Sequence, residues 1–443
     1  MMSMQPLVDI ELLVTIGGLL YVVYLFILSR RPRAERLPAP DDLFFVFMVP
    51  CLNEELVISA SLERLLAIPY PGCAVMVIDD GSDDRTAEIV SSYDPERVWL
   101  FQRVAPQARQ GKGRALNAAY NHLLTSDLLA GRDPASVVVV IVDADGRIDP
   151  SAVYEVAPYF ADPKVGAAQI GVRMYNAGES LLARMQDAEF TIFTEIYQRA
   201  RVRVGSTGLG GNGQFNRLSA LMSLGSEPWT DCLTEDLDMG LRLLAGGWNN
   251  VFVPTADVSQ QAVTNPRRLV RQRARWFQGH LQCWRRIGMM LRSDLPLRAT
   301  VDVFYHLTSP FLVLAMSLPM LAYLVALGWL GVQGQLGQVL MAHHGILLVV
   351  GYLVAFGSTP LFAFTYWLKN PRIPFYRCFA YAHAYSLYAY LWIPAGWMAT
   401  WRVVTGKKGW AKTARTADQP AGGPVVDLAA PQPAAEESRR VPA

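Results

Sequence analysis

Apolar segments long enough to cross a lipid bilayer lie at both ends of this 443-residue chain. Residues 10–28 form the first segment, and its single charge, Glu11, lies near its outer end. Three more apolar blocks follow late in the chain, at about 309–330, 345–368 and 376–400. A helix needs about 20 apolar residues to cross a bilayer core. We therefore predict a membrane protein whose polar middle part folds between an N-terminal anchor and a group of α-helical transmembrane segments.

Basic residues directly after the first apolar segment predict its orientation. Four arginines lie between positions 30 and 36. A cleaved signal peptide is disfavoured, because no basic region precedes the segment and no small-residue cleavage site follows it. Because the cytoplasmic flanks of membrane spans are rich in Lys and Arg, residue 30 onward is expected in the cytoplasm. The sequence thus predicts a retained anchor over residues 8–29 and a multi-pass protein of the cell membrane (inner or plasma membrane), with its central domain cytoplasmic.

Charge and cysteine content exclude some classes of function. The net charge of +2 is close to neutral, so we expect no nucleic-acid partner. The five cysteines show neither metal-ligand spacing nor a pairing pattern, and we expect free, mostly buried thiols. Residues 416–443 are rich in Pro, Ala, Gly and charge, which predicts a disordered tail.

Strands and helices alternate in the first part of the central domain. Apolar runs at 43–49, 74–78 and 137–142 indicate buried strands, separated by helical runs. This alternation predicts an α/β domain with a mainly parallel, Rossmann-like sheet that helices cover on both faces. Ligands in such sheets bind beyond the carboxyl ends of the strands. The acidic clusters at 79–80 and 143–145 directly follow two of these runs, so we expect a binding cleft there.

Two of the acidic clusters have a structural and a functional interpretation. Asp79-Asp80-Gly81-Ser82 is typical of a turn, which is the favoured interpretation of this cluster alone. Asp143-x-Asp145 brings two carboxylates to one point after a buried strand. Such hard oxygen ligands suit Mg²⁺ or Mn²⁺ carrying a diphosphate, although the motif is short.

Two later segments extend the predicted cleft. Residues 205–215 contain five glycines, which permit either a close approach to a ligand or a flexible surface loop. Thr234 precedes a helical run that begins with Glu235 and Asp236. These residues either cap the helix and complement its dipole or supply a carboxylate that accepts a proton from a hydroxyl. Sequence spacing alone leaves both roles open.

Cations alternate with apolar and aromatic residues over 267–286. The pattern predicts interfacial amphipathic helices over 265–300, with Arg stems along the lipid boundary, in preference to an ordinary solvated basic helix. The centre of this segment reads Gln272-Arg273-Ala274-Arg275-Trp276. Its amide, guanidinium and indole groups suit a phosphate and the apolar face of a sugar ring.

Six motifs occur in one order along the chain, and together they are far more specific than any one of them. They are Val49-Pro50-Cys51-Leu52-Asn53-Glu54-Glu55, Asp79-Asp80-Gly81-Ser82, Gly111-Lys112-Gly113-Arg114-Ala115-Leu116-Asn117, Asp143-Ala144-Asp145, Thr234-Glu235-Asp236 and Gln272-x-x-Arg275-Trp276. From residue 43 to about 290, the chain resembles the membrane-integrated family 2 glycosyltransferases, which include the cellulose, chitin, hyaluronan and poly-N-acetylglucosamine synthases. The resemblance implies a cytoplasmic domain of GT-A fold over 40–264 and transmembrane helices over 301–403.

The same resemblance implies an inverting transfer from a nucleotide-sugar donor, expected to be a UDP-sugar, with Mg²⁺ or Mn²⁺ as cofactor. Asp145, together with Asp143, matches the metal-diphosphate motif and is the expected direct ligand. Asp236, beside Glu235, matches the general base that deprotonates the acceptor hydroxyl. The donor contacts are expected at Pro50, Glu54, Asp79, Asp80, Lys112, Asp143, Gln272 and Arg275. The acceptor contacts are expected at Trp276, Gly213, Gln214 and Phe215.

Three functions are compatible with these motifs. The first is a processive synthase that extends a β-linked polysaccharide and exports it through its own channel. The second is a non-processive enzyme that places one sugar on a lipid acceptor, because single-transfer relatives share much of the motif set. The third, a membrane scaffold or permease with a degenerate domain, is disfavoured by the complete acidic set. The expected partners are therefore the donor, a polysaccharide or lipid-linked acceptor, and membrane lipid.

The segment 404–415 raises a question of topology. Its residues 409–415 resemble the gating segment that follows the last span in hyaluronan synthase-like enzymes, and a plain basic stop signal is an equal alternative. Three late spans would leave residue 409 outside, whereas its neighbouring cations indicate the inside. Either one apolar block is re-entrant or interfacial, or the count is wrong. The break at Pro394-Ala395-Gly396 makes 376–400 the block in question.

Overall fold

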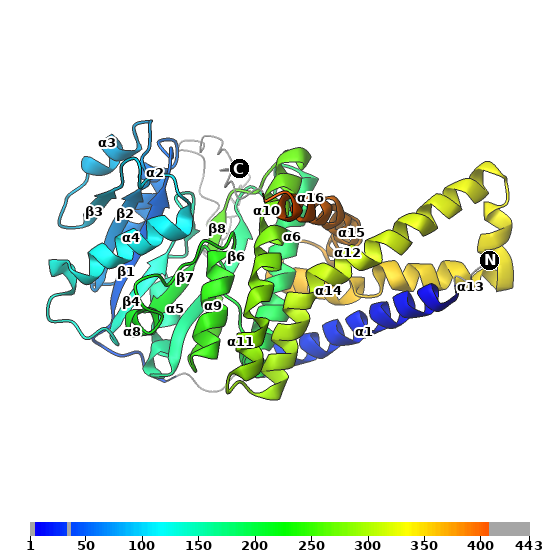
Figure 1. Ribbon diagram of the computed structural model, residues 1–443, viewed down its shortest axis with the longest axis horizontal. Helices are drawn as coiled ribbons and strands as arrows, with labels where there is room; N and C mark the ends of the chain where they lie inside the picture. The colour runs from blue at the N-terminus through cyan, green and yellow to red at the C-terminus, as the bar shows by residue number, and fades with distance from the viewer. Residues whose placement is uncertain (1–4, 33–36, 407–443) are drawn as a thin grey trace, which may run out of the picture.

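The computed structural model describes residues 5–32 and 37–406. A domain built on one β-sheet forms one side of the molecule, and long helices project from its other side (Figure 1). The predicted disordered tail and nearly all of the predicted gating segment lie outside the described residues.

Eight strands form a single mixed sheet in the order β3-β2-β1-β4-β7-β6-β8-β5. Neighbouring strands from β3 to β4 are parallel, whereas β7 is antiparallel to both β4 and β6, and β5 is antiparallel to β8. β6 and β8 are parallel as well, so four of the seven pairings are parallel and the predicted mainly parallel character holds, with antiparallel pairings at β7 and β5. The strands are β1 (Phe44–Cys51), β2 (Cys73–Asp79), β3 (Val98–Gln102), β4 (Val137–Ile141), β5 (Arg147–Ile148), β6 (Val165–Met174), β7 (Gln214–Arg217) and β8 (Asn249–Gln260).

Helices cover both faces of the sheet, as predicted. Phe45 and Phe47 of β1 pack on the face covered by α2 (Ile58–Leu66), α3 (Thr86–Ser91) and α5 (Ala152–Val156). Val46 and Met48 alternate with them and pack on the opposite face, because successive side chains of a strand point to opposite sides. The helices of that opposite face are α4 (Lys112–Leu124), α8 (Leu218–Met222) and α9 (Glu235–Ala245).

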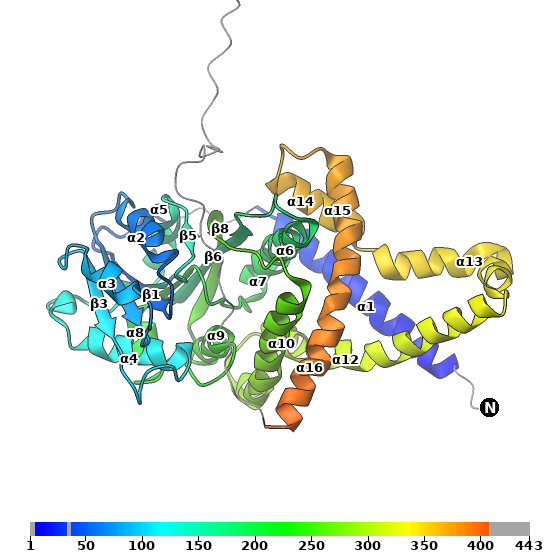
Figure 2. The same cartoon turned by 90° about the horizontal axis from the view of Figure 1, so that it is seen from above.

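Among the described residues, three helices are long and apolar enough to cross a membrane: Leu12–Arg30, Leu297–Val332 and Leu348–Lys369. They belong to α1 (Gln5–Arg30), α12 (Leu297–Val332) and the run from α13 (Leu336–Phe356) into α14 (Thr359–Lys369). In both views α1, α12 and α13 extend away from the sheet (Figures 1 and 2). Large apolar side chains such as Leu20 and Leu321 are exposed on them, which suits contact with lipid.

The apolar block 376–400 is not a single long helix. A 3₁₀ turn, Ala389–Leu391, separates α15 (Phe375–Tyr388) from α16 (Trp392–Val404). Figure 2 shows α16 lying beside α10 (Pro266–Cys283). Pro394 falls in the first turn of α16, where proline is tolerated, and Gly396 faces α10, because an added Cβ would lie 2.9 Å from the Phe277 ring. The Pro394-Ala395-Gly396 sequence therefore packs against α10, and the break in the helix lies before it, at Ala389–Leu391.

The remaining helices join the sheet domain to the membrane helices. One nearly continuous helix consists of α6 (Leu181–Ile192), a π-helical segment (Phe193–Gln198) and α7 (Arg199–Val204). After α10 come a 3₁₀ turn (Trp284–Arg286) and α11 (Ile287–Arg292), so the predicted helices over 265–300 are present, and their interfacial position stays a prediction. Two further 3₁₀ turns cover Asp127–Leu129 and Ala157–Ala161.

Candidate active site

A cavity of about 550 Å³ begins at the carboxyl ends of β1 and β4 and continues among the helices on the membrane side. It is lined by residues of the sheet domain and by residues of α6, α10, α12, α15 and α16. Ten of the predicted site residues line it: Pro50, Glu54, Asp80, Lys112, Asp143, Glu235, Asp236, Gln272, Arg275 and Trp276. Motifs that are far apart in the sequence therefore meet in one cavity.

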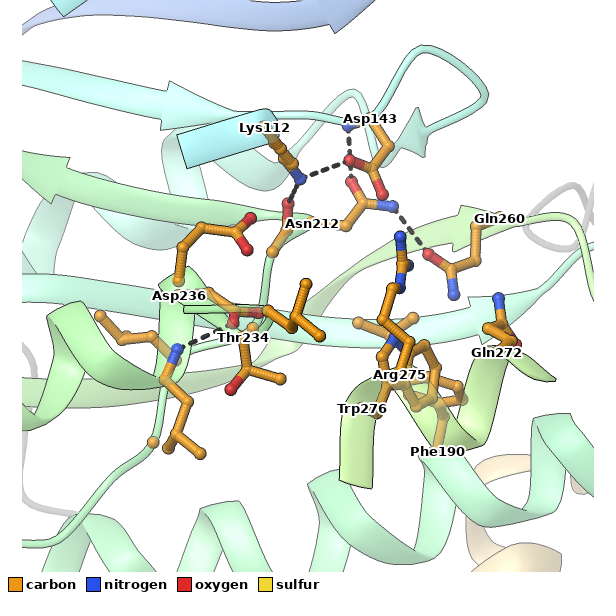
Figure 3. Close-up of a pocket in the computed structure, with 18 of the residues that line it drawn as sticks. Lys112, Asp143, Phe190, Asn212, Thr234, Asp236, Gln260, Gln272, Arg275 and Trp276 are labelled. Carbon is orange, nitrogen blue, oxygen red and sulfur yellow. Dashed lines mark hydrogen bonds and ion pairs between the residues drawn. The ribbon is translucent and has the colours of Figure 1, made fainter. Parts of the chain in front are cut away.

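Lys112 supplies a positive charge at the sheet end of the cavity. Its Nζ donates to Asp143 Oδ1 at 2.7 Å and to the Gly211 carbonyl at 2.8 Å (Figure 3). Burial opposes the charged form of Lys112, but the nearby carboxylates, above all Asp143 and Glu235, outweigh burial and raise the pKa of Lys112. The ammonium therefore stays charged at neutral pH and can bind an anionic diphosphate.

The two aspartates after β2 differ in their surroundings. Asp79 accepts hydrogen bonds from the Ser82 N–H at 2.9 Å and from Gln102 Nε2 at 3.3 Å, and it does not line the cavity. This geometry favours the turn interpretation, and Gly81 completes the turn with a positive φ of 82°. Asp80 lines the cavity and forms an ion pair of 2.5 Å with Arg103, a partner that the sequence motifs did not indicate.

Asp143 and Asp145 follow β4 directly, with Ala144 between them. Asp143 lines the cavity, and its backbone N–H donates to Asn212 Oδ1 at 3.2 Å. Asp145 is 4% exposed, and its Oδ2 accepts from the Gln261 N–H at 3.3 Å. Asp145 does not line the cavity, so Asp143 is the carboxylate that faces it; two carboxylates on alternate residues are a donor set that fits Mg²⁺ or Mn²⁺.

Glu235 and Asp236 open α9 and face the cavity. Burial raises the pKa of Glu235 to about 7, and the charge of Asp236 adds to the rise. Burial also raises the pKa of Asp236, although the Leu237 N–H, 2.8 Å from Asp236 Oδ1, and Lys112 both favour its charged form. A carboxylate whose pKa lies closer to neutrality accepts a proton from a hydroxyl more readily.

Helix α10 supplies the other wall of the cavity. Arg275 points toward Asn212 and Gln260, and Trp276 lies beside Phe190 of α6 (Figure 3). The rings of Trp276 and Phe190 are 5.9 Å apart and meet edge to face at 87°. The Arg273 guanidinium lies 4.0 Å from the centre of the Trp276 ring. The indole is therefore held between an aromatic ring and a cation, in a fixed orientation.

Arg273 is a residue that the sequence motifs missed. It is only 1% exposed, so its stem does not lie along a lipid boundary as the basic pattern suggested. Its Nη2 donates to Glu189 Oε2 at 2.5 Å, and Tyr388 and Trp392 donate to the same carboxylate at 2.8 and 2.9 Å. This Glu189 cluster joins α10 to α6, α15 and α16. Arg273 sits among other arginines in the sequence, and no pattern there sets it apart.

Three of the predicted acceptor residues do not line the cavity. Phe215 of β7 is fully buried in the sheet core, 6.3 Å from the Phe45 ring. Gln214 is buried and accepts from Asn216 Nδ2 at 3.2 Å, while the N–H of Gly213 donates to the Ile141 carbonyl at 2.9 Å. The sequence did not indicate that a strand, β7, begins at Gln214. Gly210, Gly211 and Asn212, just before that strand, line the cavity instead.

The end of α10 packs against the segment that carries Glu235 and Asp236. Gly279 permits this contact, because an added Cβ would lie 2.6 Å from the Thr234 side chain. Cys232 Sγ and Cys283 Sγ lie 3.6 Å apart beside it, a proximity that the spacing of the cysteines did not reveal. Both thiols lie near the Asp238 carboxylate, which Arg286 already binds with two nitrogens at 2.8 and 2.9 Å.

Comparison with known proteins gives consistent matches. A family model described as glycosyltransferase like family 2 matches residues 40–279. A β-monoglucosyldiacylglycerol synthase of Trichormus variabilis is 31% identical over 303 residues, which are 65% of this chain and 60% of that protein. A poly-β-1,6-N-acetyl-D-glucosamine synthase of Staphylococcus aureus is 29% identical over 241 residues, which are 53% of each chain. This chain thus spans less than two thirds of the length of either relative.

A solved structure supports the fold. A mannosyltransferase of Pyrobaculum calidifontis, in complex with GDP-Man and Mn²⁺, aligns with a TM-score of 0.58 over 90% of this chain and 99% of its own, at 20% identity. Together with the family match, this likeness confirms the predicted GT-A fold.

Proposed function

The chain belongs to the glycosyltransferase like family 2, and from this membership we propose that it transfers one sugar from a nucleotide-sugar donor, expected to be a UDP-sugar, to the hydroxyl of a membrane lipid. The observation that carries the proposal is the shape of the cavity. From Lys112 and Asp143 it continues past Asp236 to aromatic residues of the membrane-side helices, among them Tyr385 and Trp392. An acceptor with a polar head and an apolar body suits a cavity that is charged at one end and aromatic at the other.

The similarity to the lipid-modifying relative supports the same acceptor. That match covers 303 residues, compared with 241 residues for the polysaccharide synthase. The family model covers residues 40–279. The 303-residue match to the lipid-modifying relative therefore also includes residues outside the part of the chain that the family model covers. The three apolar helices support membrane association, which would place the aromatic end of the cavity near lipid.

The proposed reaction is a single in-line displacement. The acceptor oxygen bonds to the anomeric carbon as the bond from that carbon to the diphosphate breaks, which inverts the configuration. Asp236 takes the hydroxyl proton, and Lys112 and Arg275 stabilise the charge of the departing diphosphate. Mg²⁺ or Mn²⁺, held by Asp145 and Asp143, would supply further positive charge there. The Mn²⁺ and GDP-Man in the mannosyltransferase structure support this cofactor and this class of donor.

A processive polysaccharide synthase, the function that the motifs ranked first, is the second candidate. The similarity to the poly-N-acetylglucosamine synthase and the accessible indole of Trp276 support it, because an indole face can bind a growing sugar chain.

Product analysis distinguishes the two candidates. The full chain in vesicles containing diacylglycerol would be given UDP-glucose, UDP-N-acetylglucosamine, UDP-glucuronate or GDP-mannose in turn, and nucleotide release would identify the donor. Mass spectrometry of the products should then show a lipid that carries one sugar. A polymer as the sole product would overturn the lipid-acceptor proposal in favour of the second candidate.

We expect the activity to rise with pH as Asp236 loses its proton, over a range that burial shifts upward from that of an ordinary aspartate. Asp236 has to be unprotonated to act as the base, and burial raises the pKa of both Asp236 and Glu235, the latter to about 7. Activity is therefore lost as the pH falls through this range. The pH profile of kcat/KM at fixed Mg²⁺ measures the effect, and a profile that is flat between about pH 5 and pH 8 would contradict the assignment.

Trp276→Ala should reduce transfer to the acceptor by about tenfold and reduce donor hydrolysis by water much less. The indole lines the cavity and is held by Phe190 and Arg273, whereas Lys112, at the sheet end, remains in place. Parallel assays of glycolipid formation and nucleotide release test the difference. Equal losses in both assays would count against a role for Trp276 in acceptor binding.

We infer that the sheet domain and the end of α16 lie in the cytoplasm. The domain-side ends of the three apolar helices are at Arg30, Leu297 and Lys369, so the chain returns to the domain side before α15. The sequence suggested three late spans, which would place the cations after residue 406 outside the cell. With two late spans these cations lie in the cytoplasm, as the positive-inside rule expects. Green fluorescent protein fused to the C-terminus should therefore fluoresce, and a periplasmic phosphatase fused there should be inactive. The opposite pattern would overturn this topology.

A further inference from the structure

One face of α10 continues the binding surface beyond Trp276. Gln272, Trp276 and His280 are four residues apart and all line the cavity. Each step of four residues advances about 6 Å along a helix and returns to the same face. His280 therefore lies one turn beyond the indole, on the side away from Gln272.

A second histidine meets His280 from a membrane helix. His306 of α12 also lines the cavity, and the two imidazole rings are 5.3 Å apart at an angle of 81°. Nδ1 of His280 lies 3.1 Å from the Trp276 carbonyl, which can only accept, so Nδ1 carries the proton and Nε2 is the hydrogen-bond acceptor. Burial lowers the pKa of His280 and favours the neutral ring.

The surroundings of the two histidines contain a cation whose charge is already balanced. Arg201 lines the same end of the cavity and forms a buried ion pair of 3.0 Å with Asp302. Asp302 also accepts from Tyr21 at 2.5 Å and from Ser206 at 2.8 Å. An anionic headgroup would have to compete with this carboxylate for Arg201, and a buried charge without a partner is costly. This end of the cavity therefore suits an uncharged polar ligand.

We propose that His280 and His306 form an acceptor subsite that hydrogen-bonds the uncharged, hydroxyl- and ester-bearing head of a neutral glycerolipid. His280 Nε2 accepts from a headgroup hydroxyl other than the one that receives the sugar, whose proton goes to Asp236, and a ring N–H of His306 donates to an ester or hydroxyl oxygen. The inference rests on the proposed transfer to a lipid and adds to it the class of headgroup, neutral rather than phosphorylated. The acyl chains would lie among the aromatic side chains near Phe193 and Tyr197, which line the same cavity.

The test uses the full chain in vesicles that contain either monoacylglycerol, which is neutral, or phosphatidylglycerol, which is anionic; each of these lipids has two free hydroxyls. His306→Ala and His280→Ala should each lower kcat/KM for monoacylglycerol by about tenfold, mainly through KM, because each removes one hydrogen bond. Donor hydrolysis should fall much less than transfer. Gln, which keeps a hydrogen-bonding group, should restore part of the loss at either position. The unaltered protein should prefer monoacylglycerol to phosphatidylglycerol.

His122→Ala is the matched control. His122 lies exposed near the end of α4, stacked on Phe101 with ring centres 5.0 Å apart, and does not line the cavity. Its kinetics should match those of the unaltered protein. Glycolipid formation that is unchanged in both His280→Ala and His306→Ala, equal losses of transfer and hydrolysis, or a preference for phosphatidylglycerol would each overturn the histidine subsite alone. Polymer as the sole product of the unaltered protein would instead overturn the proposed lipid acceptor.

Discussion

Replacing Asp236 with Asn is expected to lower the rate of sugar transfer by about a thousandfold while donor binding stays nearly unchanged. The carboxylate faces the cavity at the start of α9, and asparagine keeps both its shape and an oxygen for the Leu237 N–H. The amide does not take a proton at neutral pH, so the acceptor hydroxyl loses its base. Transfer of labelled sugar to diacylglycerol measures the rate, and titration calorimetry with UDP measures donor binding.

Glu235→Gln is the matched control for this substitution. Glu235 is the adjacent residue, it lines the same cavity, and glutamine removes an ionisable carboxyl group from the same place. If Asp236 is the base, Glu235→Gln should cost much less activity than Asp236→Asn. A larger loss in Glu235→Gln would move the role of base to Glu235, and unchanged turnover in Asp236→Asn would remove Asp236 from the mechanism.

Gly279→Ala should lower kcat by about a hundredfold, although residue 279 is not among the predicted site residues. The added Cβ would lie 2.6 Å from the Thr234 side chain and 2.7 Å from its backbone nitrogen. Because the backbone cannot easily move, α10 and the start of α9 have to separate. Trp276 and Asp236 sit on these two elements, so the acceptor and its base would lose their alignment.

Gly288→Ala, in α11, provides the comparison. An added Cβ there would meet the flexible end of Arg292 at 3.4 Å, an ordinary contact. Steady-state kinetics and the melting temperature should be measured for both variants. The expected result is a folded Gly279→Ala protein with low kcat and a Gly288→Ala protein close to normal. Normal turnover in Gly279→Ala would show that the two elements can separate without harm.

Much of this site could be predicted from the sequence because its charged residues directly follow continuous apolar runs. The runs that form β1 and β4 are buried on both faces, so they are uniformly apolar and easy to recognise. The carboxyl ends of parallel strands meet at one edge, which explains why Pro50 and Asp143 line one cavity. The first apolar span was equally clear, since lipid exposure demands an unbroken apolar sequence.

The remaining features depend on partners that are distant in the sequence. Phe215 looked like part of a glycine-rich ligand loop, but its strand inserts between β4 and β6 and buries the ring. Arg273 looked like one more surface cation, but Glu189, 84 residues away, holds it in the interior. The apolar block at 376–400 has the composition of a span, yet part of it packs against α10. No local pattern reports such contacts.

The cavity described above has walls from two parts of the chain. Lys112, Asp143 and Asp236 come from the sheet domain, whereas Trp276, His306 and Trp392 come from the helices that follow it. A fragment that ended at residue 264 would keep the whole sheet and the carboxylates of Glu235 and Asp236, but it would lack the proposed surface for the acceptor. The sheet domain therefore ends before the cavity does, because the membrane-side helices supply walls of the cavity that the sheet domain lacks.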